Sequence, residues 1–251
     1  MRPVNVRFLF PLLPLFLLVS ACASSQATRK QAEYHYQMGL SYLGENNATG
    51  ALVELTEAEK IDPDDPDLQF NLGRAYFLKE RYDIAEQKFA RALKLKPEYS
   101  EARFHLGLVY LQLKRWDEAV FQFKLVTEDI FYPNHDLAAI NLGIAYTGKG
   151  EYPKALVTLR SVVDNDPRNP IAKVYLGQLY LKVDKVELAI MEFNNAIRIN
   201  GNYANAHYNL GLAYLKNRDN KAALAAFREV VRISPESDLG RQAREYLDLL
   251  K

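Results

Sequence analysis

The sequence repeats itself with a spacing of 34 residues, and this feature constrains the fold more than any other. Six glycines, each preceded by Met or Leu, are separated by 34, 34, 36, 34 and 34 residues. Each glycine is followed by Tyr three positions later, by Ala twelve positions later and by Leu or Phe sixteen positions later. Units this short cannot bury an apolar face alone, so they must stack on one another. The glycines are Gly39, Gly73, Gly107, Gly143, Gly177 and Gly211.

This pattern resembles the tetratricopeptide repeat, a helix–turn–helix unit with the order L-G-x₂-Y…A-x₃-F…P. The resemblance implies an all-α fold, a right-handed superhelical solenoid of six repeats over residues 32–237. The tryptophan that the family usually carries at repeat position 4 is absent. Its place is taken by His35, Gln69, Arg103, Ala139, Lys173 and His207. The implied repeats are residues 32–65, 66–99, 100–135, 136–169, 170–203 and 204–237.

The repeat glycines and the end of the chain carry further expectations. A glycine inside a helix costs about 1 kcal/mol relative to alanine, so six of them indicate helices in close contact. The alanine twelve residues later is the expected small partner, with Tyr and Phe or Leu filling the space beside it.

Because the last repeat needs a polar-backed lid, we expect residues 238–251 to form a capping helix. Its apolar face would be Leu239, Ala243, Tyr246, Leu247 and Leu250.

The third repeat contains an insertion. Residues 124–133, KLVTEDIFYP, are two residues longer than their counterparts in the other repeats. Two residues would turn a helix face by about 200°, so the extra length is expected at a helix end or in the following loop. Phe131 and Tyr132 would then be partly exposed. They either pack at the joint between the third and fourth repeats or form a secondary contact.

The N-terminus has the organisation of a secretory signal peptide. Arg2 and Arg7 form a basic region before an apolar stretch over residues 8–19. This stretch is shorter than the roughly 20 residues of a membrane-spanning helix. The following residues, Val-Ser-Ala-Cys over 19–22, resemble a bacterial lipobox. The alternative is an ordinary signal peptide cleaved after Ala21, which would leave Cys22 as a free thiol.

The lipobox resemblance implies a location for the protein. Residues 1–21 would be a lipoprotein signal peptide, and Cys22 would be acylated, for example with palmitate, as the first mature residue. Residues 22–31 would hold the lipidated Cys and a polar tether, of which nine extended residues reach about 30 Å. Ala23 stands where an Asp would retain the lipoprotein at the inner membrane. The resemblance therefore implies an outer-membrane lipoprotein facing the periplasm of a Gram-negative type cell.

The sequence shows no pattern typical of catalysis. The formal net charge of +1 gives no electrostatic footprint for nucleic acid. The single cysteine excludes an internal disulfide, and the four histidines show no metal-ligand spacing. The glycine pair of Gly148-Lys149-Gly150 falls at the turn inside the fourth repeat. We therefore predict a protein that is not an enzyme and has no cofactor, metal, nucleic-acid partner or small-molecule substrate.

Family resemblance also implies a partner-binding groove. In tetratricopeptide repeats the first helix of each unit lines it, chiefly through repeat positions 2, 5, 9, 12 and 13. Here the residues at positions 5, 9 and 12 are mostly apolar, and most aromatic in the first three repeats. Arg74 is the one basic residue at positions 5 and 9, which disfavours a carboxylate clamp and favours an amphipathic helix as ligand. The alternative is packing against neighbouring helices. The predicted groove residues are Tyr36, Leu40, Leu43, Phe70, Arg74, Phe77, Phe104, Leu108, Leu111, Ile140 and Ile144.

Lipobox, tether, six repeats and capping helix together resemble the type IV pilus pilotin family, the PilF/PilW/Tgl-like outer-membrane lipoproteins. That resemblance implies a protein that brings the pilus secretin to the outer membrane or promotes its multimer assembly, and so supports twitching or gliding motility. A secretin segment would occupy the groove, and Cys22 would be the anchor. The alternative is a general envelope scaffold lipoprotein, for outer-membrane protein assembly or docking of peptidoglycan enzymes.

Overall fold

The computed structural model describes the backbone of residues 13–250 and the side chains of residues 26–250. Every regular element within these residues is an α-helix. The described residues divide into two compact units, the first ending at Ala102 and the second beginning at Arg103. None of the described helices combines the length and the hydropathy that a membrane span requires.

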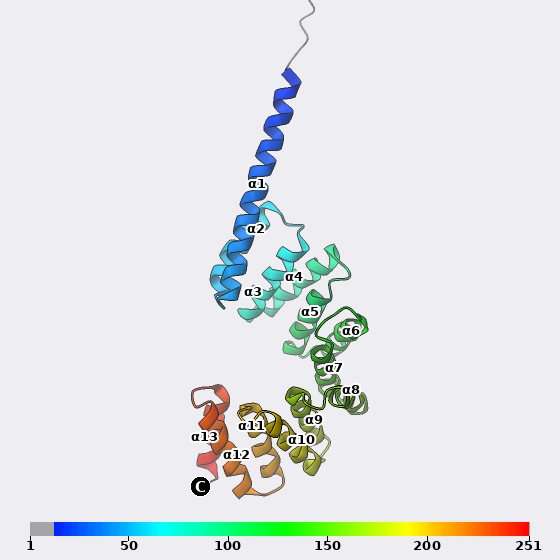
Figure 1. Ribbon diagram of the computed structural model, residues 1–251, viewed down its shortest axis with the longest axis vertical. Helices are drawn as coiled ribbons and strands as arrows, with labels where there is room; N and C mark the ends of the chain where they lie inside the picture. The colour runs from blue at the N-terminus through cyan, green and yellow to red at the C-terminus, as the bar shows by residue number, and fades with distance from the viewer. Residues whose placement is uncertain (1–12, 251) are drawn as a thin grey trace, which may run out of the picture. The chain divides into compact units, whose positions relative to one another are not determined.

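Successive helices pair within each unit (Figure 1). The first unit contains α1 (Leu13–Gly44), α2 (Ala48–Ile61), α3 (Pro66–Leu78), α4 (Tyr82–Leu95) and the start of α5 (Ser100–Gln112). The second unit contains the rest of α5, α6 (Trp116–Glu128), α7 (His135–Lys149), α8 (Tyr152–Asn165), α9 (Pro170–Lys182), α10 (Val186–Ile199), α11 (Ala204–Lys216), α12 (Asn220–Ile233) and α13 (Asp238–Leu249). The prediction of an all-α repeat fold is confirmed.

The repeat glycines permit close contact between paired helices, but with a larger partner than we expected. A Cβ atom on Gly177 would lie 2.5 Å from Cε1 of Phe193, and one on Gly143 would lie 2.6 Å from Cγ of Leu159. The same holds for every repeat glycine and the Leu or Phe sixteen residues later. The glycine therefore seats this large side chain directly, rather than the alanine twelve residues later.

The turn inside each repeat has one recurring geometry. The residue seven positions after each repeat glycine has a positive φ, between 55° and 84°. The N–H of the next residue donates to the carbonyl of the repeat tyrosine at 2.8 to 2.9 Å, as in a Schellman motif. Only the fourth repeat places a glycine at this left-handed position. The residues are Asn46, Glu80, Lys114, Gly150, Asp184 and Arg218.

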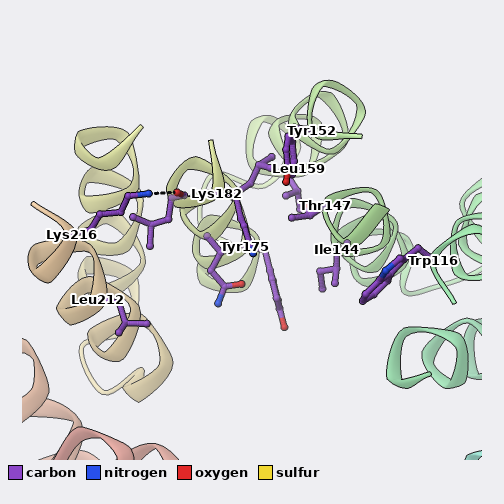
Figure 2. A pocket seen from close by; sticks show the side chains of 13 residues that line it. Trp116, Ile144, Thr147, Tyr152, Leu159, Tyr175, Lys182, Leu212 and Lys216 are labelled. Atoms are coloured by element: carbon purple, nitrogen blue, oxygen red, sulfur yellow. Dashed lines mark hydrogen bonds between the residues drawn. The ribbon is translucent and has the colours of Figure 1, made fainter. Parts of the chain in front are cut away.

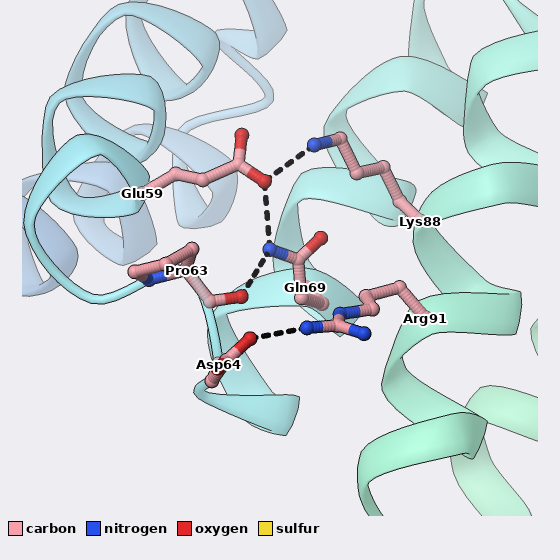
Figure 3. Close-up of polar contacts among 6 residues, drawn as sticks. All are labelled: Glu59, Pro63, Asp64, Gln69, Lys88 and Arg91. Atoms are coloured by element: carbon pink, nitrogen blue, oxygen red, sulfur yellow. Dashed lines mark hydrogen bonds and ion pairs between the residues drawn. The ribbon is translucent and has the colours of Figure 1, made fainter.

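Polar side chains occupy the place of the missing tryptophan in five of the six repeats, and Ala139 occupies it in the fourth. In the first unit, Gln69 of α3 is buried and donates a 2.7 Å hydrogen bond to Glu59 of α2 (Figure 3). Lys88 of α4 reaches the same carboxylate oxygen at 2.5 Å, and Arg91 of α4 pairs with Asp64. One carboxylate thus connects three consecutive helices and holds the first helix pair against the second.

The same two repeat positions pair in other repeats. The side chain at position 4 meets the one nineteen residues later, on the second helix of its own repeat. These pairs are His35 with Glu54 at 2.8 Å, Arg103 with Gln122 at 3.5 Å and Lys173 with Glu192 at 3.8 Å. In the first, third and fifth repeats, a polar link between the two helices of the repeat therefore takes the place of the usual indole.

The end of the second unit is covered by α13. Ala243 is fully buried against Phe227 and Val230 of α12. The ring of Tyr246 stacks on the ring of Phe227, with centroids 4.7 Å apart and planes within 4°. Ser237 caps α13 by accepting from the N–H of Gly240 at 3.0 Å. The apolar face of α13 therefore covers the core of the last helix pair.

The segment that we expected to be a tether is helical. Helix α1 includes residues 22–31 without interruption, although the side chains of residues 26–31 are exposed. Burial starts at Ala32, where the first repeat was predicted to begin. Neither Gly nor Pro occurs between Pro14 and Gly39, and Ala, Gln, Arg and Lys favour helix. The helix of the first repeat therefore extends into this segment instead of stopping before it.

The insertion separates its two aromatic residues. Tyr132 is buried, and its ring lies 5.9 Å from that of Phe104. In the second repeat, the ring of Tyr99 lies in the same way 5.1 Å from that of Phe70. Phe131 is 87% exposed and Ile130 is 79% exposed. Tyr132 thus packs in the core, in line with the alternative of packing between the third and fourth repeats, whereas Phe131 lies at the surface.

Candidate functional site

The predicted groove residues of the first unit are only partly accessible. Tyr36, Leu40, Arg74 and Phe77 are half-buried, whereas Leu43 and Phe70 are buried. Arg74 is not a free cation, because it donates to Asn71 Oδ1 at 3.0 Å and its guanidinium lies 5.7 Å from the ring of Phe70. The partners of Arg74 therefore come from its own helix.

A second polar cluster lies at the start of α3. The amide of Asn71 donates to the hydroxyl of Tyr36 at 3.1 Å. Burial raises the pKa of Tyr99 well above its usual range, and a hydrogen bond to Asp67 adds to this effect. The tyrosines of this face are thus neutral hydrogen-bonding groups that link α1, α3 and the segment after α4.

In the second unit, Leu108, Leu111 and Ile144 are half-buried, whereas Phe104 and Ile140 are buried. The ring of Phe104 lies 5.6 Å from that of Phe123. Position 5 of the repeat therefore faces the second helix of its own repeat. This corrects the prediction for four residues, which belong to the core and not to an open groove: Leu43, Phe70, Phe104 and Ile140.

An apolar depression lies in the second unit, across the fourth to sixth repeats (Figure 2). Its volume is about 720 Å³, and the first helices α7, α9 and α11 supply most of its wall. We call it the α7–α11 groove. Of the predicted groove residues, it includes Ile144. Its wall consists of Trp116, Ile144, Thr147, Gly148, Tyr152, Leu159, Tyr175, Gln178, Leu179, Leu181, Lys182, Leu212 and Lys216.

Aromatic side chains give the groove its apolar character. Trp116 is the first residue of α6 and lies against Gly148, where a Cβ atom would come within 2.6 Å of its ring. Gly148 thus allows the indole to cover the end of α7. Tyr175 of α9 is half-buried, and burial raises the pKa of its hydroxyl. At neutral pH it offers the groove a neutral hydroxyl group.

Positive charge is found at the α9–α11 end of the groove. Lys182 and Lys216 belong to its wall, which contains no acidic residue. Lys216 donates to the carbonyl of Leu181 at 2.9 Å and pairs with Asp184 at 2.9 Å. Lys182 is exposed and has no hydrogen-bond or ion-pair partner among the described residues. This end therefore carries one uncompensated cation.

Charges at the Trp116 end are balanced instead. Lys149 pairs with Asp117 at 2.7 Å and with Glu151 at 2.6 Å, and Glu151 also pairs with Lys154 at 2.6 Å. The hydrogen bond that Lys149 donates to Asp117 raises the pKa of Lys149 above its usual range, and the one to Glu151 adds to this effect. The hydrogen bonds that Glu151 accepts from Lys149 and from Lys154 lower the pKa of Glu151. Lys149 and Glu151 thus remain charged at neutral pH.

The backbone of Cys22 lies in α1, but its side chain lies outside the described residues, as do residues 1–12. Among the described residues, no group of three His, Cys, Asp or Glu side chains is placed to hold a metal ion. Gly148 lies in the last turn of α7, and Gly150 lies in the turn that joins α7 to α8.

Eight of the thirteen wall residues occupy repeat positions 9, 12 and 13, which the family pattern names, although the predicted groove residues included only Ile144 of them. Trp116 and Tyr152 start second helices, which the groove pattern of first helices does not include. Lys182 and Lys216 occupy the same repeat position, 34 residues apart, at the end of successive first helices. That shared position was the available signal for a basic end of the groove.

Comparison with known proteins identifies the repeat. Two family models described as "Tetratricopeptide repeat" match this chain, one over residues 79–128 and the other over residues 204–237. The model "TPR repeat" matches residues 41–79 and 177–217. Together these matches cover more than half of the chain. A chloroplastic tetratricopeptide repeat domain-containing protein of Arabidopsis thaliana, PYG7, is 33% identical over 111 residues. The match covers 42% of this chain and only 36% of that protein.

Two solved structures show a similar fold. PilF of Pseudomonas aeruginosa has a TM-score of 0.67 and 19% identity, over 87% of this chain and 99% of that chain. PilW, described as a widely conserved type IV pilus biogenesis factor, has a TM-score of 0.73 and 20% identity, over 85% and 98%. The repeating glycine geometry, the paired helices and the family matches lead to one conclusion: this chain belongs to the tetratricopeptide-repeat family.

Proposed function

We propose that this protein is a lipid-anchored, protein-binding module of the outer membrane that promotes assembly of the type IV pilus secretin. The observation that carries the protein-binding part is the α7–α11 groove, an aromatic and apolar depression of about 720 Å³. Concave apolar surfaces between the helices of repeat proteins are suited to extended or helical protein segments. An amphipathic helix of the partner would lay its apolar face against Ile144 and Leu212.

Support for the pilus assignment comes from the extent of the similarity. PilF and PilW are each covered almost completely by this chain, at 99% and 98% of their lengths. The Val-Ser-Ala-Cys segment before the repeats adds the expectation of a lipid anchor. An anchor confines the module to the membrane plane and raises the effective concentration of a membrane-bound partner. A protein that acts through its location at the membrane and through partner binding needs no catalytic residues.

The pilus role is tested by deleting the gene. Cells without the protein should lose heat-resistant secretin multimers, surface pili and twitching or gliding motility, and a plasmid copy should restore all three. Intact multimers and intact motility in the deletion strain would rule out the pilus role. A broad loss of outer-membrane proteins with normal pili would instead favour a general envelope scaffold.

The anchor is tested at Cys22. The Cys22→Ser variant should incorporate no labelled palmitate, should accumulate as uncleaved precursor and should not fractionate with the outer membrane. Labelling that persists in this variant would contradict lipidation at this residue.

The groove is tested by polar substitution of its wall. The Ile144→Gln/Leu212→Gln double variant should fold but lose secretin binding. A matched control is Val157→Gln/Met191→Gln, which changes two exposed apolar residues outside the groove wall. Both variants should keep the helical circular dichroism of the parent protein. Equal secretin binding by the groove variant and the control would refute the groove as the binding site.

A further inference from the structure

The distribution of charge around the α7–α11 groove is asymmetric. At the Trp116 end, Asp117 and Glu151 are matched by Lys149 and Lys154 in a closed set of ion pairs. Farther along the groove, on α9, Lys182 has no partner among the described residues. Figure 2 shows that Trp116 and Lys216 lie at opposite ends of the groove and that Lys182 lies on the helix between them.

Other groups at the α9–α11 end do not compensate Lys182. Lys216 is already held by Asp184 and by the carbonyl of Leu181. Gln178 donates to Asn209 at 3.1 Å and thereby links α9 with α11, but neither amide carries charge. The acidic residues of the Trp116 end belong to their own set of ion pairs. Lys182 is therefore the one cation of the described groove wall that is available to a ligand.

An apolar ligand would cover this cation at a cost. An ammonium group that loses part of its hydration without gaining a partner is destabilised, whereas an opposite charge compensates the loss. The cation at the edge of an apolar surface thus selects against a purely apolar or basic segment. It favours a segment that combines an apolar face with a carboxylate at one side.

We propose that the α7–α11 groove binds an amphipathic helical protein segment whose apolar face is flanked by an acidic residue, and that this residue meets Lys182. The polarity of the groove then fixes the orientation of the segment, with its acidic side at the α9–α11 end and its apolar side chains toward Trp116. This inference rests on the proposed function, because it assigns a ligand class to the same groove.

The test uses a displayed library of random 16-residue peptides and the full-length acylated protein in phosphatidylcholine vesicles. Selection on the parent protein should enrich apolar and aromatic residues together with Asp or Glu at a fixed position. Selection on Lys182→Gln should enrich the apolar residues without the acidic one. The matched control is Lys185→Gln, which removes an exposed lysine outside the groove wall and should keep the acidic preference.

Binding is then measured through Trp116, the only tryptophan in the chain. A selected peptide should shift its emission to the blue as the apolar face covers the indole. Changing the acidic residue of that peptide to its amide should weaken binding roughly two- to fivefold, as expected for an accessible ion pair. The difference should shrink at high salt and disappear in the Lys182→Gln variant.

Each result separates this inference from the proposed function. Peptides that bind in the groove with no acidic preference, or a Lys182→Gln variant that retains the preference, would overturn the inference and leave groove binding intact. Enrichment that is equal on the Ile144→Gln/Leu212→Gln variant would overturn the groove itself. Sodium oleate is the remaining probe: if it displaces selected peptides and binds more tightly than they do, the groove is a site for lipid acids and not for protein.

Discussion

At the scale of single residues, each repeat glycine is a seat for one large side chain. Phe193 is completely buried, and a Cβ atom on Gly177 would lie 2.5 Å from its ring. In Gly177→Ala the ring or the helix must move, so we expect the free energy of unfolding to fall by about 1–3 kcal/mol, as for other overpacked cores. Urea unfolding followed by circular dichroism measures this loss.

The matched control for this substitution is Gly201→Ala. The nearest atom to a Cβ at that position is 3.9 Å away, and φ there is not positive. Removing a glycine from an unstrained turn should leave stability unchanged or raise it by about 0.4–1 kcal/mol. A Gly177→Ala protein as stable as the Gly201→Ala protein would contradict the steric role of the repeat glycine.

The left-handed position of the turn is a second residue-scale feature. Lys114 has a φ of 55°, a conformation that costs residues with a Cβ roughly 1–2 kcal/mol. Lys114→Gly should therefore raise the unfolding temperature, and Gly150→Ala, at the equivalent position with a φ of 84°, should lower it. Differential scanning calorimetry of the two variants checks the opposite signs. Shifts of the same sign would show that backbone strain does not govern this position.

At the scale of helices, a buried ion pair joins α9 to α10. Lys173 and Glu192 are both largely buried, 3.8 Å apart, and Glu192 Oε2 has no hydrogen-bond partner. Breaking such a pair on one side typically costs about 3–5 kcal/mol, because a buried charge is left alone. We therefore expect Lys173→Met to be strongly destabilising and Lys173→Met/Glu192→Leu to recover most or all of the stability.

An exposed pair in the first unit provides the comparison. Lys60 and Glu57 lie on one turn of α2 with most of Lys60 in solvent. Lys60→Met should cost less than about 1 kcal/mol, the usual limit for surface pairs. If the two lysine variants were equally stable in urea, or if the double variant were no better than Lys173→Met, burial would not control the cost of the α9–α10 pair.

The helices also show which elements local sequence determines. Gly and the Tyr three residues later recur in all six repeats, and a closing Pro ends five of them, so the bounds of the repeats could be predicted from the sequence. The continuity of α1 could not, because residues 22–31 lack apolar periodicity but contain nothing that stops a helix. Residues without a core face leave helix and tether equally compatible with the pattern.

At the scale of the whole molecule, packing between helices decided which residues are accessible. Phe70 and Phe104 share a repeat position with Tyr36, yet the two phenylalanines are buried and the tyrosine is half-buried. The repeat pattern gave all three the same role. Trp116 contributes to the groove from the start of a second helix, and only the path of α6 beside α7 brings it to Gly148. A contact of this kind between two helices cannot be deduced from the spacing of residues along the sequence.

The capping helix tests how the repeat array ends. Without residues 238–251, the ring of Phe227 and the side chain of Val230, both fully buried now, would face water. Terminal repeats need a polar outer face to stay soluble, and α13 supplies it with Arg241, Arg244 and Asp248. We expect the truncated protein to self-associate in size-exclusion chromatography and to unfold at a lower temperature.

A milder variant separates lost packing from lost chain length. Tyr246→Ala removes the ring that stacks 4.7 Å from Phe227 and should cost roughly 1–3 kcal/mol, less than a fully buried aromatic residue. Leu249→Gln, at a residue of the same helix that is 79% exposed, should change nothing. If a protein that lacks α13 remained monomeric and as stable as the parent, the last helix pair would not depend on a cap. The array would then end in α12 with its apolar face in solvent, which the burial of Phe227 argues against.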